Sequence, residues 1–271
     1  MVRDVFRAYD VFGNIAVVKF SRSVKQKEKK QFANKILKSN KSVKTVLEKK
    51  GKFSGRLRLM QTKYVAGERT KEVLYKENGC IFRFNIDKTY FSPRLNNERK
   101  EIAGKIKKND SVLVMFAGVA PYPIVIAKKS KARNVVSNEI NREANKYAEL
   151  NIELNKLKDK IELVPGDIKR IARKGGLNVK GTLVPLQFDV IVMPRPKLKE
   201  TFLKQAFMLS KKGTRIYYYG FSKIDEINSL IEEVKEEAKK NRKKIRILNK
   251  KIAGEIAPYK ARVRIDFKVL N

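Results

Sequence analysis

The chain has 271 residues, 42% of them hydrophobic, which predicts one large domain or two smaller ones with a sizeable buried core. Its 64 Lys and Arg residues against 28 Asp and Glu leave a formal net charge of +36, which favours a nucleic-acid partner first and an anionic membrane surface second. The absence of histidine and the single cysteine, Cys80, exclude histidine-based triads, His/Cys zinc sites and intrachain disulfides.

Targeting signals are not evident in the sequence. The opening MVRDVFRAYD lacks the apolar core of a signal peptide, and no run of about 18 uncharged apolar residues follows. We therefore expect a soluble, cytoplasmic protein. With no histidine in the chain, acid–base catalysis would have to use carboxylates, lysines, tyrosines or the substrate itself.

Short apolar runs fill the first third of the chain. IAVVKF, SVKTVLEK and CIFRFNI predict strands, and an amphipathic helix is expected over residues 25–37. The basic run over residues 25–30 fits a solvated helix face and an RNA contact about equally well. We expect a small α+β domain over residues 1–88 that binds tRNA.

From Ser111 onward, strands and helices alternate. SVLVMF, NVVSNE, KIELV and FDVIVM predict strands, with helices from about residue 122, over 141–155, and a shorter one after KIELV. A helix near residues 198–209, the strand GTRIYYYGF, a charged helix near 225–240 and two closing strands from about residue 244 follow. The alternation predicts an α/β domain over residues 89–271 with about seven mostly parallel strands and an antiparallel finish. Ahead of it, Ser92 and Pro93 can cap and start a helix.

The turn after the first parallel strand predicts a nucleotide-type ligand. Such ligands bind at the carboxyl ends of the strands, and Glu139 lies 21 residues after Gly118, the spacing of a ribose-binding acid. Because the turn holds a single glycine, a pyrophosphate is disfavoured and S-adenosylmethionine fits better. Asp167, after the third strand, could accept a hydrogen bond from the adenine amino group. Taken singly, each acid is more often a strand-end or cap residue.

These motifs resemble those of the archaeal tRNA (guanine-37 N1)-methyltransferases over nearly the whole chain. The matching segments include GNIAVVKF, SVKTVLEKKGKFSGRLRL, VMFAGVAPYPI, NEINREA, GDI and IVMPRP, and the most specific joins KENGC to YFSPRL and ER. The resemblance implies a Rossmann-like class I methyltransferase domain, with a seven-stranded mostly parallel sheet and an antiparallel C-terminal hairpin, preceded by a small α+β RNA-binding domain. It implies tRNA with guanine at position 37 as the partner, bound at the anticodon arm, and S-adenosylmethionine as the cofactor.

The resemblance also implies roles for individual residues. It gives Glu98 the role of general base and places active-site arginines at Arg58 and Arg94. Methyl-donor contacts fall on Tyr90, Phe116, Ala117, Gly118, Glu139, Asn141, Asp167, Met193 and Pro194. Contacts with the substrate fall on Arg58, Arg94, Pro194, Arg195 and Pro196.

The chemistry of the reaction agrees with these roles. Guanine N1 carries a proton at neutral pH, so alkylating it requires an acceptor, and a carboxylate within hydrogen-bond reach is suitable. Arg94 and Glu98 are four residues apart, which predicts one helix face, although such a pair can also be an ordinary surface ion pair. The base must leave the anticodon stack to be reached, and basic residues over 239–251 would hold the RNA backbone.

The sequence departs from the family pattern at three positions. Val114 replaces an acid, Ala120 replaces a glycine, and Pro194 stands where the family has an asparagine. A basic insertion between Asp167 and Asp189 fits a surface loop or an RNA contact. The match begins near Val11, so the extra N-terminal domain of many members is absent from it, which leaves recognition centred on the anticodon arm.

Three alternatives remain beside guanine-37 methylation by a monomer without a metal. A bifunctional wyosine-pathway enzyme would also methylate carbon 7 of tricyclic 4-demethylwyosine at position 37. A related aminocarboxypropyltransferase would use the same cofactor, but Arg94 and Pro196 count against it. A tRNA-binding protein with a decayed catalytic domain is motivated by Val114, Ala120 and Pro194 and opposed by Glu98.

Overall fold

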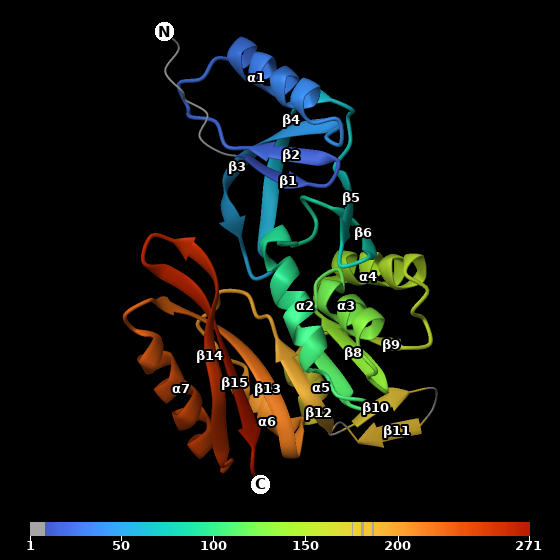
Figure 1. Cartoon of the computed structure of the whole chain (residues 1–271), viewed down its shortest axis with the longest axis vertical. Helices are drawn as coiled ribbons and strands as arrows, with labels where there is room; N and C mark the ends of the chain where they lie inside the picture. The colour runs from blue at the N-terminus through green and yellow to red at the C-terminus, as the bar shows by residue number, and fades with distance from the viewer. Residues whose placement is uncertain (1–8, 175, 180–181, 186) are drawn as a thin grey trace. The chain divides into compact units, whose positions relative to one another are not determined.

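The computed structural model describes residues 9–174, 176–179, 182–185 and 187–271. The chain forms two compact units, Met1–Pro93 and Arg94–Asn271, which are described separately below (Figure 1). The sequence places the boundary slightly earlier, between residues 88 and 89. All the parallel strands predicted after Ser111 fall in the second unit.

The first unit is a small α+β fold. Its four-stranded sheet has the order β1-β2-β3-β4, with β2 and β3 parallel and the other pairs antiparallel. The strands are β1 (Tyr9–Phe12), β2 (Ile15–Val18), β3 (Thr45–Ser54) and β4 (Leu59–Gly67). Helix α1 (Gln26–Ser39) buries Ala33 and Ile36 against the apolar face of this sheet, which confirms the helix predicted over residues 25–37.

A two-stranded hairpin completes the first unit. Strands β5 (Glu72–Glu77) and β6 (Cys80–Asn85) pair antiparallel through a turn at Asn78 and Gly79. The side chain of Asn14 joins the hairpin to the sheet, because it donates to the carbonyl of Glu72 at 3.1 Å and accepts from the amide of Leu74 at 2.7 Å. Two hydrogen bonds of one side chain therefore link the hairpin to the sheet.

The second unit contains the predicted seven-stranded sheet, in the order β14-β15-β13-β12-β7-β8-β9. Strands β7 (Ser111–Met115), β8 (Asn134–Glu139), β9 (Ile161–Pro165), β12 (Phe188–Met193) and β13 (Ser210–Lys223) form the parallel part. Strands β14 (Ile245–Ala257) and β15 (Lys260–Val269) form an antiparallel hairpin, and β15 pairs antiparallel with β13. The expected fold class, including its antiparallel finish, is confirmed.

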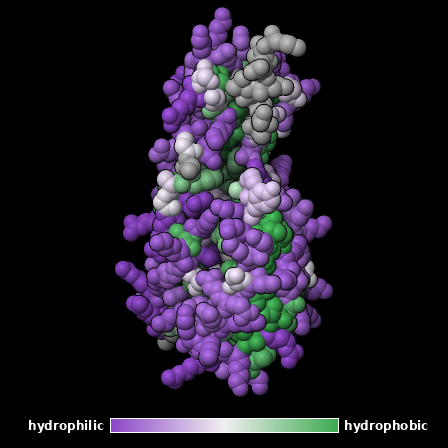
Figure 2. Space-filling view, turned by 90° about the vertical axis from the view of Figure 1, so that its left-hand side faces the viewer, coloured by the Kyte–Doolittle hydropathy of each residue, from purple (hydrophilic) through white to green (hydrophobic). Residues whose placement is uncertain are grey.

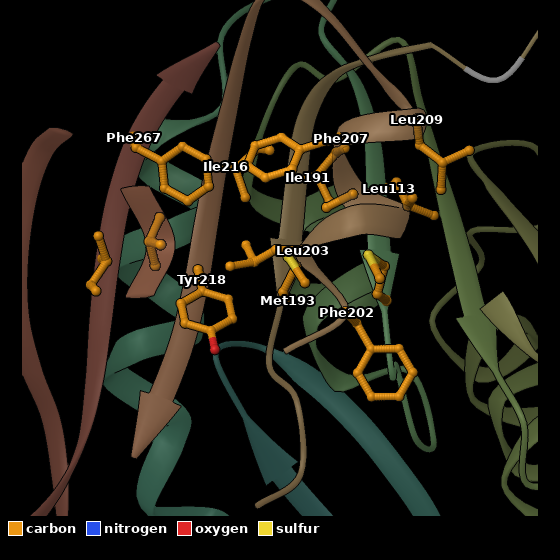
Figure 3. Packing of buried hydrophobic residues seen from close by; sticks show 14 of the residues in the cluster. Leu113, Ile191, Met193, Phe202, Leu203, Phe207, Leu209, Ile216, Tyr218 and Phe267 are labelled. Carbon is orange, nitrogen blue, oxygen red and sulfur yellow. The ribbon is translucent and has the colours of Figure 1, made fainter. Parts of the chain in front are cut away.

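Helices cover both faces of this sheet. In Figure 1, α2 (Asn96–Lys105) and α3 (Pro121–Lys129) lie in front of the strands, whereas α5 (Ile168–Arg173) and α6 (Leu203–Met208) lie behind them. The remaining helices are α4 (Arg142–Leu154) and α7 (Ile227–Lys240). Figure 3 shows the core behind the sheet, where Ile191 and Met193 of β12 and Tyr218 of β13 point toward Leu203 and Phe207 of α6.

Three local expectations needed correction. Pro93 begins a single 3₁₀ turn over Pro93–Leu95, and α2 itself begins at Asn96 without a side-chain cap. The helix expected near residues 198–209 is shorter, because it begins only after Phe202, which has a left-handed φ of 60°. Between Asp167 and Asp189, the described residues form α5 and a hairpin of β10 (Gly176–Val179) and β11 (Thr182–Pro185) in place of the expected surface loop, and an RNA contact of this segment stays a prediction.

Candidate active site

The loop between β7 and α3 is held in an unusual backbone conformation. Phe116, Gly118 and Ala120 have φ values of 57°, 60° and 65°, which belong to the left-handed region. Side chains with a Cβ adopt this region at a cost, so Ala120 bears strain at a position where the resemblance expects glycine. The loop thereby turns its backbone amides toward the carboxyl end of the next strand, β8.

Glu139, the last residue of β8, fastens this loop. Its Oε2 accepts from the amide of Gly118 at 2.7 Å, and its Oε1 accepts from the amides of Ile140 and Asn141, both at 2.8 Å. Glu139, the acid predicted to bind a ribose, therefore links the turn between β7 and α3 to the turn between β8 and α4 by hydrogen bonds. Three backbone donors on one carboxylate fix its position within narrow limits.

The other two polar candidates at this edge are helix caps. The side chain of Asn141 accepts from the amide of Glu143 at 3.0 Å and caps α4, and Asp167 accepts from Lys169 at 3.0 Å and caps α5. Both therefore have the structural roles that sequence reasoning favours for a single acid or amide at a strand end. Because β7, β8 and β9 are adjacent and parallel, these caps and the Gly118 loop lie along one edge of the sheet.

The strand order changes direction at β7, where Met193 ends the neighbouring strand β12 and Pro194 follows it. From β7 the chain proceeds to β8 on one side and returns to β12 on the other, which is the place where open α/β sheets bind ligands. Apolar surface borders it: the ring of Phe116 meets that of Phe202 edge-on at 5.0 Å, and Ala117 is buried. Val114 is fully buried within β7.

Arg195 and Pro196 follow Pro194 in a loop. Arg195 is buried, and its guanidinium donates to the carbonyls of Leu198 and Glu200, both at 3.0 Å, so it shapes this loop. Pro196 is half-buried. A substrate contact by either residue stays a prediction.

Glu98 lies on α2 with 4% of its surface exposed. Its Oε1 accepts hydrogen bonds from the hydroxyl of Tyr219, at 3.0 Å, and from the guanidinium of Arg264. The ammonium of Lys251 lies 3.4 Å from Oε2. The i, i+4 spacing placed Arg94 on the same face, but Arg94 precedes α2 in the 3₁₀ turn and is exposed, so it does not share the buried environment of Glu98.

A charged cluster extends from Glu98 across the sheet. Arg264 is fully buried and also binds Asp266, through Nε at 2.6 Å, and Glu101, through Nη2 at 2.7 Å. Burial alone would raise the pKa of Glu101, but hydrogen bonds from Lys251 and Arg264 outweigh it and lower the pKa to about 2. These carboxylates balance the charge of the buried guanidinium.

Two buried tyrosines lie next to each other near Glu98, and one of them, Tyr219, donates a hydrogen bond to it. The rings of Tyr122, on α3, and Tyr219, on β13, meet edge-on with centroids 6.0 Å apart. Burial raises the pKa of Tyr122 to about 12 and that of Tyr219 well above its usual value. Both phenols therefore remain protonated at neutral pH and can act as hydrogen-bond donors.

Within the first unit, the structure brings two of the predicted residues together. The guanidinium of Arg58 lies 5.4 Å from the ring centre of Phe53, and the ring of Tyr90 packs edge-on against the same ring at 5.6 Å. Lys49 lies over that ring as well, at 4.1 Å. Arg58 has a left-handed φ of 56° in the β3–β4 turn. The result is a partly exposed aromatic surface with two cations beside it.

Sequence reasoning missed three residues that surround Glu98, namely Tyr219, Arg264 and Asp266, and it assigned Lys251 only to the basic run expected to hold the RNA backbone. The signal that could have found them is the alternation of charged residues in RVRID, an apolar strand. One face of that strand holds Arg262, Arg264 and Asp266 while the other is aliphatic. Assigning partners still required the register of three strands.

Basic residues dominate the exposed side of the β14–β15 hairpin, whereas the exposed positions of α7 carry both lysines and glutamates. This side, at the left of Figure 1, faces the viewer in Figure 2 and is mostly hydrophilic with separate apolar patches. Leu248 and Ile252 of β14 are 50% and 43% exposed, and Tyr259 at the hairpin turn is 82% exposed. A surface that mixes cations with an exposed aromatic ring suits a nucleic acid. No helix among the described residues has both the length and the apolar composition needed to cross a membrane.

Two family models match the sequence. One, described as the TRM5/TYW2 methyltransferase domain, covers residues 73–248, and a second, the TYW2 N-terminal domain, covers residues 1–70. Together the two models account for nearly all of the chain up to residue 248.

Individual relatives agree with these matches. A protein of Nanoarchaeum equitans named tRNA (guanine(37)-N(1))/4-demethylwyosine(37)-methyltransferase Taw22 is 34% identical, over 97% of this chain and 100% of its own length. The crystal structure of Trm5b from Pyrococcus abyssi superposes with a TM-score of 0.86 at 31% identity, over 100% of this chain and 78% of that one. Trm5 of Methanocaldococcus jannaschii, solved in complex with adenosine, superposes with a TM-score of 0.79 at 29% identity, over 98% of this chain and 76% of that one.

Proposed function

Because this chain belongs to the TRM5/TYW2 methyltransferase family, we propose that it methylates N1 of guanine 37 in tRNA, with Glu98 accepting the N1 proton. The observation that carries the proposal is the position of Glu98. Tyr219 and Arg264, on strands β13 and β15, hold this buried carboxylate by hydrogen bonds. The same seven-stranded sheet carries the loop between β7 and α3 at which we expect the cofactor to bind. Because the chain contains no histidine, a carboxylate is a suitable acceptor for this proton.

S-adenosylmethionine is the methyl donor, and the residues at the strand ends suit it. Glu139 and Asp167, on neighbouring strand ends, offer carboxylate oxygens to ribose hydroxyls and to the adenine amino group. Phe116 and Met193 supply apolar surface at the same edge. When bound, the cofactor supplies an electrophilic methyl group on a sulfonium. Asn141 and Ala117 support this site through the α4 cap and the loop backbone.

Glu98 has the chemistry that the proton transfer needs. Removal of the N1 proton makes that nitrogen nucleophilic, and the proton passes to a Glu98 oxygen. The contact of Lys251 with Oε2 is the longest that Glu98 makes with a cation in the structure, and Lys251 is 42% exposed. An incoming guanine could therefore displace Lys251 while Tyr219 and Arg264 keep the carboxylate in place.

The first unit supplies a surface for the RNA. Arg58 and Phe53 place a guanidinium beside an aromatic ring, an arrangement that holds phosphates and stacks on unpaired bases. Tyr90, for which the resemblance implies a methyl-donor contact, packs on the same ring. The target base must leave the anticodon stack before N1 can be reached, so such a surface has a direct use. Arg94, which is exposed just before α2, would supply a further guanidinium to the RNA.

Nucleoside analysis tests the proposal. Purified protein is incubated with S-adenosylmethionine and an unmodified tRNA transcript bearing guanine 37, and the digest is examined for 1-methylguanosine. A transcript with adenine at position 37 is the matched control. Product from the first transcript alone supports the proposal, and the absence of product from both contradicts it.

A second activity is favoured by one observation. The Nanoarchaeum equitans relative that matches over its full length has a name that includes 4-demethylwyosine as well as guanine. We propose the same second substrate here, with Pro194 as part of the wall that faces the larger base. Incubation with tRNA carrying 4-demethylwyosine tests it, and a methylated tricyclic base is the expected product. Recovery of that base unmodified would restrict the protein to guanine.

A further inference from the structure

Three strands present a row of polar residues to helix α2. In the sheet register, Arg264 of β15 lies opposite Tyr219 of β13 on one side and opposite Lys251 of β14 on the other. Cross-strand neighbours in this position project from the same face of the sheet. All three contact Glu98, so a single row of the sheet holds one carboxylate from three directions.

The centre of this row is fixed by further bonds. Arg264 is fully buried, and Asp266, two residues along the same strand, accepts from its Nε at 2.6 Å and its Nη2 at 3.1 Å. Glu101, one turn along α2 from Glu98, accepts a further hydrogen bond from Nη2 at 2.7 Å. A guanidinium held on three sides in this way has one orientation available.

A buried arginine surrounded by carboxylates is a poor way to increase the free energy of unfolding. Burying an arginine with several carboxylates carries a large desolvation penalty, and apolar side chains of similar volume often serve a core as well or better. The cluster nevertheless converges on Glu98, the residue whose orientation matters most for the proposed reaction. A small misplacement of a reacting group is enough to lower a rate strongly.

We propose that Arg264 and Tyr219 are positioning residues for Glu98, which hold Oε1 so that Oε2 faces the guanine N1 proton. This inference rests on the proposed function. Neither residue touches the substrate; each acts through the general base. Lys251 is the displaceable third partner, because it is the most exposed of the three and is shared with Glu101.

Paired tyrosine variants test the role of Tyr219 with the smallest change of side chain. Tyr219→Phe removes only the hydroxyl that binds Glu98, and Tyr217→Phe removes a hydroxyl from the same face of the same strand, two residues away. We expect Tyr219→Phe to lower kcat about tenfold, with KM for tRNA and for S-adenosylmethionine within about twofold of wild type. Tyr217→Phe should keep kcat close to the wild-type value.

Arginine variants provide a second measurement. Arg264→Gln should lower kcat by about a hundredfold or more, and Arg264→Lys should restore part of that loss because a cation again faces Glu98. Arg215→Lys is the control, since Arg215 pairs with Asp110 and donates to the carbonyl of Lys105 at the end of α2, away from Glu98, and lysine keeps a cation at that position. If Arg264→Gln does not fold, the tyrosine pair decides the question.

Different results would contradict the proposed methylation and the positioning role of Arg264 and Tyr219. Wild-type protein that forms no 1-methylguanosine contradicts the proposed function and the positioning role with it. Wild-type activity combined with equal kcat values for Tyr219→Phe and Tyr217→Phe overturns the positioning role alone. A rise in KM with kcat unchanged would also overturn it, because it would show that the residues affect binding instead of orienting the base.

Discussion

Substitution of Glu139 by glutamine tests how the cofactor loop is held. The carboxylate accepts three backbone N–H groups, from Gly118 at 2.7 Å and from Ile140 and Asn141 at 2.8 Å. A glutamine oxygen can keep the pair at one end, but the amide NH₂ then meets the N–H of Gly118, and two donors face each other. The variant therefore loses a charge-assisted hydrogen bond and leaves a backbone donor unpaired.

The size of the effect follows from that lost bond. A hydrogen bond to a charged group contributes about 1.5–3 kcal/mol, so the second unit should lose about 2 kcal/mol of its free energy of unfolding. If Glu139 also binds the ribose, affinity for S-adenosylhomocysteine should fall by about 10- to 100-fold, since about 1.4 kcal/mol corresponds to a factor of ten.

Calorimetric titration and urea denaturation followed by circular dichroism measure the two quantities. Glu143→Gln, on the same helix N-terminus but in an exposed pair with Lys146, is the matched control and should change neither. The reasoning is refuted if Glu139→Gln binds the ligand within about twofold of this control and unfolds at the same urea concentration.

Three further outcomes are expected. Hydrogen bonds from Lys251 and Arg264 outweigh burial and lower the pKa of Glu101 from its ordinary value of 4.5 to about 2, so its stabilising contribution is complete above about pH 4.5 and is lost as the pH falls toward 2. Glu101→Gln should thus flatten the acid dependence of the denaturation midpoint in that window, and wild type and variant losing stability in parallel would contradict the pairing. Affinity for tRNA should fall about a hundredfold or more between about 50 and 200 mM salt, measured by filter binding, whereas a flat dependence would remove the phosphate contacts. Phe53→Ala, which removes the ring between Arg58 and Tyr90, should weaken tRNA binding and leave S-adenosylhomocysteine binding unchanged, and an equal loss of both would argue against a separate RNA surface.

The periodic parts of the fold could be predicted from the sequence. Buried runs such as SVLVM and FDVIVM, separated by amphipathic helices, specify parallel strands, and the close pair after Lys244 specifies a hairpin. The start of α2 was less predictable, because a proline can begin either a 3₁₀ turn or an α-helix, and Leu95 follows it as a cap without a side-chain acceptor. The short α6 depends on the left-handed backbone of Phe202, which no pattern reveals.

Some residues of the candidate site could likewise be predicted from the sequence, and others could not. Glu139 and Asp167 could be placed from the sequence because each follows a predicted strand, and parallel strands end at one edge. The partners of Glu98 could not, since Tyr219, Lys251 and Arg264 are separated from it by more than a hundred residues and meet it only through the register of β13, β14 and β15. Long-range register is a tertiary property, and a single sequence contains little of it.

The account rests on Glu98 as the proton acceptor at guanine 37, and single-turnover methylation tests this most directly. Wild type and Glu98→Gln are compared on the same guanine-37 transcript, with labelled S-adenosylmethionine and nucleoside analysis of the product. The account predicts 1-methylguanosine from wild type and a loss of about a hundredfold or more in rate for Glu98→Gln, with ligand affinity retained. A Glu98→Gln variant that forms 1-methylguanosine at the wild-type rate would contradict it.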